Sequence, residues 1–101
     1  MAMRMTSTTR AVLHVLQEAA SRRDATYGLE ICRETNLGSG TVYPILTKFE
    51  RLGLVHTYWE DESDVRGPRR RMYELTAEGS REAQRAAQRV AAPARRLGWA
   101  R

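Results

Sequence analysis

The sequence predicts one mostly α-helical domain with a single small β-hairpin near its C-terminal end. Three observations predict this class. The chain has 101 residues and a mass of 11.5 kDa, which is enough for one domain. Apolar residues recur at helical spacing through the first half, and this period changes to alternation after residue 53. A last helical segment follows, so the expected order is helix, helix, helix, strand, strand, helix.

The first two helices lie on either side of a polar connection, and the second is short. From Thr8 to Ala20 most apolar residues fall on one helical stripe, and the hydroxyl residues 6–8 can cap the start. A second helix is expected after a cap at Thr26, running from Tyr27 to about Thr35. Residues 36–40 contain asparagine and two glycines, which favour a turn.

The third helix is expected from Thr41 to Leu52, with Gly53 as its C-terminal stop. Pro44 restricts where this helix begins, because a proline in a helix interior costs about 3 kcal/mol and is cheap only in the first turn. Either the helix begins at Thr41 and Pro44 lies in its first turn, or Gly40 relieves the clash in a helix capped at Ser39.

Two strands and a final helix follow. Residues 54–59 and 71–75 are rich in β-branched and aromatic side chains and predict the hairpin. The polar residues 60–70 between them contain Gly67-Pro68 as a turn. Thr76 can cap the last helix, from Ala77 to about Leu97. Two helices joined by a short glycine-containing turn, with a hairpin behind, predict a helix-turn-helix with a β wing over residues 1–79, of which residues 1–6 are expected to be flexible.

The charge indicates an acidic partner. Lys and Arg number 17 against 12 Asp and Glu, a formal charge of +5, and the pI is about 10.1. Nucleic acid is the commonest partner for such a domain. No apolar stretch approaches the roughly 18 residues of a membrane span, and no secretory signal is evident. Cys32 is the one cysteine, so no internal disulfide can form and a cytoplasmic location is expected.

The polar face of the third helix suits DNA. Small residues near its start would let the backbone approach a groove, while hydroxyl groups and cations further along can reach phosphates or base edges. An ordinary solvated helix face is the alternative interpretation. The candidate residues on this face are Gly40, Pro44, Thr47, Lys48 and Arg51, with Thr41 and Tyr43 on its flanks.

The hairpin loop carries a second candidate contact. Four arginines, Arg66, Arg69, Arg70 and Arg71, lie within six residues, and arginine is favoured at phosphates and in narrow minor grooves. Four acidic residues in the same loop support the alternative of a solubilising loop. Strand alternation requires one or two of the last three arginines to point back toward the body.

Four segments resemble the PadR family of transcriptional regulators, over roughly Thr8 to Gly79. They are Tyr27-Gly-Leu-Glu-Ile31, Gly40-Thr-Val-Tyr-Pro-Ile-Leu46, Phe49-Glu-Arg-Leu-Gly-Leu-Val55 and Gly67-Pro-Arg-Arg-Arg-Met-Tyr-Glu-Leu-Thr-Ala-Glu-Gly79. The resemblance implies a bacterial, homodimeric winged helix-turn-helix protein, usually a repressor, bound to double-stranded DNA. By analogy Ser39, Thr41, Tyr43 and Lys48 would meet the major groove, and the wing would meet the backbone or minor groove.

Residues 80–101 are expected to form the dimerisation helix and tail, as the resemblance implies for short members of the family. The apolar positions of this segment follow a 3.5-residue repeat, which is a seam for another helix. Pro93 lies within the repeat, where a proline can kink or end a helix. The expected interface comprises Ala83, Ala87, Val90, Ala94 and Leu97 on this segment, with Val12, Leu13 and Leu16 of the first helix, and the operator would be a pseudo-palindrome. The alternative is that the first and last helices pack only within one chain.

Catalysis is not expected, because the sequence holds no nucleophile–base arrangement or phosphate-binding loop. His14, Cys32 and His56 lack the close spacing of metal ligands, so neither a metal nor a cofactor is expected. Two alternatives to a DNA-binding repressor stay open. One is a winged helix that grips an acidic protein. The other is a sensor of the MarR type governed by a small-molecule effector of unknown identity or by a metal.

Overall fold

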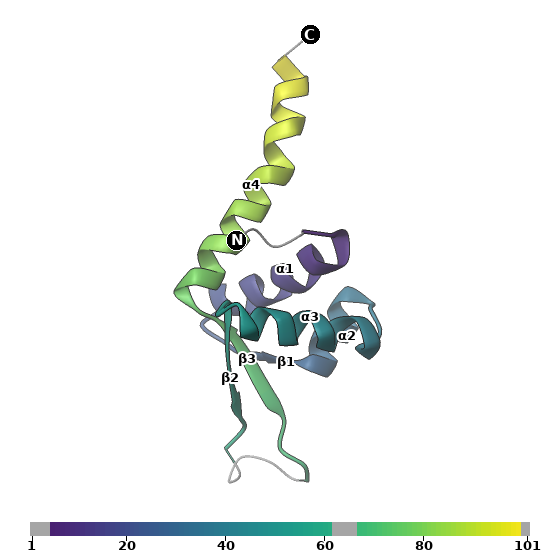
Figure 1. Ribbon diagram of the computed structural model, residues 1–101, viewed down its shortest axis with the longest axis vertical. Coiled ribbons are helices and arrows are strands. Elements are labelled where there is room, and N and C mark those ends of the chain that lie inside the picture. The colour runs from purple at the N-terminus through teal and green to yellow at the C-terminus, as the bar shows by residue number, and fades with distance from the viewer. Residues whose placement is uncertain (1–4, 62–66, 100–101) are drawn as a thin grey trace.

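The computed structural model describes residues 5–61 and 67–99, and their side chains as far as Gln88. Four helices pack against one small antiparallel sheet, and the predicted mostly helical winged fold is confirmed (Figure 1). The elements are α1 (Ser7–Ser21), β1 (Thr26–Tyr27), α2 (Gly28–Thr35), α3 (Ser39–Arg51), β2 (Val55–Trp59), β3 (Arg71–Leu75) and α4 (Ala77–Trp99).

The core lies where α1 packs across α2 and α3. α1 starts at its cap Thr6, whose side-chain oxygen accepts a hydrogen bond from the Thr9 backbone N–H at 3.2 Å. One face of α1 is buried against the inner faces of α2 and α3, as its helical spacing predicts. The largest fully buried side chains of this core are Phe49, Leu13, Leu16, Ile31, Leu46, Val12 and Val42.

The sheet has three strands, in the order β1-β3-β2, so the expected two-stranded hairpin is incomplete. Thr26 was expected to cap the second helix, and this is wrong: it pairs with Tyr73 of β3 and is 1% exposed. Its hydroxyl donates to Glu30 Oε1 at 2.6 Å, and Tyr27 occupies the N-cap position of α2 instead. A strand of two residues has no periodicity of its own, because it is defined entirely by its partner strand.

α3 begins two residues earlier than the expected start at Thr41. Gly38 is its N-cap, and Pro44 therefore lies in the second turn, so the alternative that places Pro44 in the first turn is wrong. Gly40 stands four residues before Pro44, where a proline ring crowds the preceding turn. At the other end Leu52 is the C-cap and Gly53 has a φ of +76°, so the predicted glycine stop is confirmed.

α4 runs as a single helix from Ala77 to Trp99, close to the expected range of Ala77 to about Leu97, so Pro93 does not end it. Its first turn is capped by Thr76, whose Oγ1 accepts from the Gly79 backbone N–H at 3.0 Å. α4 projects from the body on the side opposite the outer end of the hairpin, which gives the molecule extents of 58 × 26 × 26 Å (Figure 1). Among the described helices, none is long and apolar enough to cross a membrane.

Candidate nucleic-acid interface

One face of α3 is open to solvent while the other is sealed in the core. Val42, Leu46 and Phe49 are 0% exposed, and they anchor the helix. Within the described residues, Thr47, Lys48 and Arg51 make no side-chain hydrogen bond or ion pair, so their donors are available to a ligand. The residues expected to face DNA all lie on the exposed face, namely Ser39, Gly40, Thr41, Tyr43, Pro44, Thr47, Lys48 and Arg51.

Tyr43 also has a packing role that its position on the flank did not reveal. It is 40% exposed, yet its ring lies directly over the first residue of α2. A Cβ placed on Gly28 would come within 2.2 Å of Tyr43 Oη. Tyr43 therefore fills the joint between α2 and α3, and Gly28 is the residue that leaves room for it.

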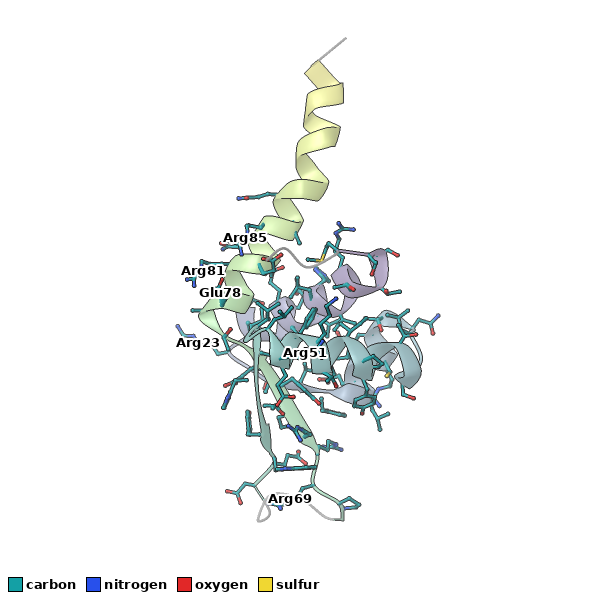
Figure 2. The ribbon with its side chains drawn as sticks, in the orientation of Figure 1. Arg23, Arg51, Arg69, Glu78, Arg81 and Arg85 are labelled. Carbon is teal, nitrogen blue, oxygen red and sulfur yellow. The ribbon has the colours of Figure 1, made fainter. Side chains whose placement is uncertain are left out.

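The arginines in the outer part of the hairpin differ in whether they form an ion pair. Arg69 lies near the far end of the hairpin (Figure 2) and makes no side-chain hydrogen bond or ion pair within residues 5–61 and 67–99. Arg70 Nη1 lies 3.2 Å from Glu60 Oε2, and its guanidinium stands 4.5 Å from the centroid of the Tyr27 ring. Arg66 lies outside the described residues.

Arg71 ties the wing to α3. Its Nη2 lies 3.3 Å from Glu50 Oε2, and its Nε donates to Thr57 Oγ1 at 2.8 Å. Its guanidinium also lies 5.6 Å from the Trp59 ring centroid. Two of the last three arginines, Arg70 and Arg71, therefore contact the body, and Arg70 lies just before the first residue of β3. Because both ion pairs are solvent-exposed, each contributes little to stability, and DNA phosphates can compete for the guanidinium groups.

Tyr73 does not add negative charge beneath this surface. Burial raises the pKa of the Tyr73 hydroxyl, and the nearby Arg71 guanidinium offsets part of that shift. Tyr73 therefore stays protonated and neutral at physiological pH. Tyr73 therefore takes no attraction for an anion away from the arginines above it.

The expected dimerisation residues divide between the core and α4. Val12, Leu13 and Leu16 are at most 1% exposed within one chain, and their contact with a partner's helix stays a prediction. They are buried because α2, α3 and the first turns of α4 already cover that face of α1. Ala83 is likewise 3% exposed, whereas Ala87 is open. The side chains of Val90, Ala94 and Leu97 lie outside the described residues.

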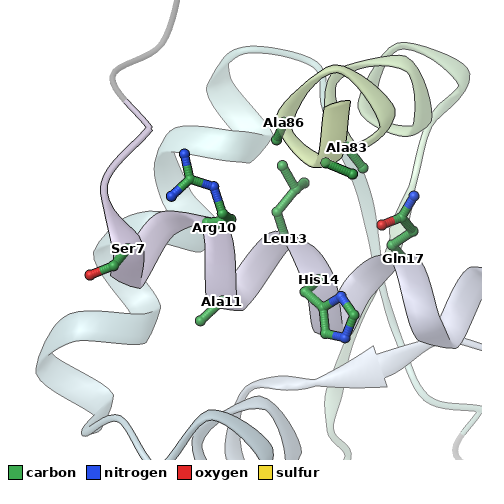
Figure 3. A pocket seen from close by; sticks show the side chains of 9 residues that line it. Ser7, Arg10, Ala11, Leu13, His14, Gln17, Ala83 and Ala86 are labelled. Atoms are coloured by element: carbon green, nitrogen blue, oxygen red, sulfur yellow. The ribbon is translucent and has the colours of Figure 1, made fainter. Parts of the chain in front are cut away.

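An open groove of about 450 Å³ remains between α1 and α4. Leu13 points toward Ala83 and Ala86 across it, while Arg10 and His14 stand at its edges (Figure 3). The groove is thus apolar at its floor and polar at its rim, which is the pattern of a helix-binding surface. Within the described residues, no group of three His, Cys, Asp or Glu side chains is placed to hold a metal ion.

Sequence reasoning missed four residues that shape the candidate interface. Glu50 and Glu60 hold the arginines, Tyr27 lies beneath Arg70, and Trp59 stands 54% exposed beside Arg71. The contacts of Glu50 and Tyr27 cross between elements far apart in sequence. Trp59 carried one usable signal, because an aromatic residue at the end of a strand, next to a polar loop, has little to pack against.

A sequence model of the PadR-like transcriptional regulator family matches residues 12–85 of this chain. The chain belongs to the PadR-like family. It is a regulator rather than an enzyme, and its family supports DNA-binding control of transcription. No curated protein matches its sequence significantly.

Solved structures resemble this PadR-like regulator along most of its length. A PadR family transcription regulator from Clostridium difficile R20291 is 26% identical, with a TM-score of 0.69 over 83% of this chain and 86% of that one. MepR, a transcription regulator of a Staphylococcus aureus multidrug efflux pump, is 22% identical with a TM-score of 0.72, and the match covers 92% of this chain and 63% of MepR. A transcriptional regulator from Clostridium thermocellum is 19% identical with a TM-score of 0.66, over 90% and 86%. The last two show the fold alone.

Proposed function

We propose that this PadR-like regulator is a homodimeric repressor that inserts α3 into the major groove of a pseudo-palindromic operator. The observation that carries the proposal is the exposed face of α3. Small residues occupy its first turn, and the unpaired donors of Thr47, Lys48 and Arg51 follow it. Small residues allow a close approach to the bases, and the cationic side chains can reach guanine or phosphate. The proposed repressor acts in the bacterial cytoplasm, where chromosomal DNA lies.

The wing would meet the neighbouring minor groove or its phosphates. Arg71 links β3 to Glu50 at 3.3 Å, so the hairpin leaves the body beside the C-terminal half of α3. When α3 lies in the major groove, the hairpin therefore points toward the adjacent groove of the duplex. Arg69, near the far end, supplies the free positive charge.

The dimer would form around α4. This helix stands out from the body, and one chain alone leaves the groove between α1 and α4 open. Within the described part of the chain, the buried Nε of Arg10 at this groove has no hydrogen-bond partner, and a second chain can supply one. We place the partner's α4 in the groove, with Ala87, Val90, Ala94 and Leu97 on the seam. Two copies of α3 would then address half-sites about 34 Å apart.

Selection from a random duplex library tests DNA reading. We expect a two-fold symmetric sequence, bound in preference to a scrambled duplex of equal length. Lys48→Ala should weaken binding to the selected duplex by about 1–3 kcal/mol, and Arg69→Ala should lower the slope of log affinity against log salt by about 1. Arg81→Ala removes the same charge from α4 and should leave that slope unchanged. A protein that selects no sequence would contradict the proposal.

Sedimentation equilibrium tests the dimer. The full chain should sediment as a dimer, and removing residues 80–101 should yield a monomer or an unfolded chain with affinity reduced to the non-specific level. Ala87→Glu offers a milder change, because it places a charge in the groove at an exposed position. A truncated protein that stays dimeric and binds the selected duplex normally would refute this arrangement.

A further inference from the structure

A second hollow, of about 430 Å³, lies between the start of α2, α3 and the outer part of the wing. Its walls come from Leu29 of α2, Tyr43 of α3, Trp59 of β2 and the segment 68–71. It opens where β3 extends beyond the two-residue strand β1, so among the described residues no strand pairs with that end of β3 on the β1 side. The fold therefore leaves a gap beside α3.

The walls of this hollow combine two chemistries. Leu29 is 58% exposed, Trp59 is 54% exposed and Tyr43 is 40% exposed, so three large apolar side chains face solvent around one gap. Soluble proteins seldom gather such residues on a surface without a ligand for them. The segment 69–71 adds three arginines to the same walls. Apolar surface beside guanidinium groups matches a chain of deoxyribose rings joined by phosphates.

The arginines are already oriented for such a ligand. Arg70 is held over the Tyr27 ring at 4.5 Å, and Arg71 lies 5.6 Å from the Trp59 ring. Contact with an aromatic face restricts a guanidinium group while leaving some of its N–H donors free. Binding a phosphate then requires little further ordering of these side chains.

The geometry points to the occupant. If α3 lies in the major groove and the hairpin in the adjacent minor groove, one sugar–phosphate strand must cross between them, because that strand is what separates the two grooves. We infer that the hollow seats this strand, with Trp59 and Leu29 packed on deoxyribose and Arg69, Arg70 and Arg71 on its phosphates. This inference rests on the proposed function, and it adds Trp59 and Leu29 to the DNA-binding surface.

Trp59 reports on its own contact. The chain has two tryptophans, so Trp99→Phe leaves Trp59 as the single emitter. The oligomeric state and duplex affinity of the Trp99→Phe variant are first compared with those of the wild type. We expect the Trp59 emission to be quenched or shifted on titration with the selected duplex, in proportion to the fraction bound. A scrambled duplex should give the same change at higher concentration, because backbone contacts are independent of sequence.

Substitution gives a second readout, with a control on the neighbouring residue. Trp59→Ala should weaken binding about tenfold for selected and scrambled duplexes alike. Tyr58→Ala removes an aromatic ring that is 41% exposed, one residue away and on the opposite face of the sheet. It should change the affinity less than twofold. Circular dichroism confirms that both variants are folded.

The outcomes separate this inference from the function on which it rests. If the single-tryptophan protein binds the selected duplex with unchanged Trp59 emission, and Trp59→Ala binds as Tyr58→Ala does, the inference is overturned and the proposed function stands. Benzoate serves as a probe for the alternative that the hollow binds a small aromatic anion. Trp59 emission that changes with benzoate but not with bound duplex would also overturn the inference. A protein that binds neither duplex would overturn the proposed function and the inference together.

Discussion

The base of the wing and its outer end are held by different forces. The base is where Leu54 leads into β2 and β3 leads into α4, and the outer end is the part around Trp59 and Arg71. At the base the contacts are hydrogen bonds to backbone carbonyl groups. Thr76 N–H donates to the Leu54 carbonyl at 3.0 Å, and Thr76 Oγ1 donates to the Gly53 carbonyl at 2.7 Å. At the outer end the contacts are exposed ion pairs beside an open hollow.

Because of this difference, the wing has a fixed direction and an outer end that can still adapt. Close-packed backbone tolerates almost no displacement, so the base fixes the direction in which the hairpin leaves the body. Exposed ion pairs are weak and exchange readily with other anions, so the outer end can adjust to a duplex. Each of the predictions below changes one side of this comparison.

Gly79→Ala should have the largest effect, because it acts at the base. A Cβ at Gly79 would lie 2.0 Å from the Leu54 carbonyl oxygen, which is backbone and cannot move aside. We expect the free energy of unfolding to fall by about 3 kcal/mol, measured by urea denaturation. Gly40→Ala is the matched control, since nothing lies within 4 Å of the added atom. Equal stability of the two variants would show that the base is not rigid.

Glu50→Gln should have a smaller effect and acts at the outer end. It removes the carboxylate that lies 3.3 Å from Arg71 Nη2, so the guanidinium is released. Stability should change by less than about 0.5 kcal/mol, while duplex affinity at low salt should rise roughly twofold to fivefold. Glu18→Gln, on α1, removes the same charge elsewhere as a control. Weaker binding in Glu50→Gln would show that Arg71 acts as a brace and not as a phosphate contact.

Glu78→Gln should have the smallest effect, because it alters an exposed pair beside the base. A hydrogen bond from Arg81 lowers the pKa of the Glu78 carboxyl below its ordinary value of 4.5. The pair therefore contributes stability above about pH 4.5, and this contribution is lost as the pH falls through the lowered pKa. Thermal unfolding followed from pH 7 to pH 3 should show a slightly flatter acid limb in the variant. A steeper limb would contradict the assignment.

The sequence predicted the parts of the fold that repeat along the chain. Helical spacing located α1 and α3, and Gly53 marked the end of α3 because a positive φ is cheap for glycine. It did not predict β1, whose two residues acquire their structure from Tyr73 and Met72 across the sheet. Thr26 was mistaken for a helix cap because a threonine before a helix satisfies the same local rule.

The candidate site divides in the same way. The exposed face of α3 could be predicted, because the apolar stripe defines its opposite side. The state of the wing arginines could not, since Glu50 meets Arg71 only after the hairpin has folded against α3. Nor could the burial of Leu13 and Leu16 inside one chain be distinguished from burial by a partner, because both give the same apolar pattern.

The contact between Gly28 and Tyr43 has a consequence for how this protein can change during evolution. The two positions belong to different helices, yet the space that a side chain at residue 28 would need is already filled by the Tyr43 ring. A larger residue at position 28 therefore requires the Tyr43 ring to swing aside, or a shorter residue at position 43 in a paired change. Because Tyr43 stands on the face proposed to bind DNA, such a paired change would also alter which operators the protein can recognise.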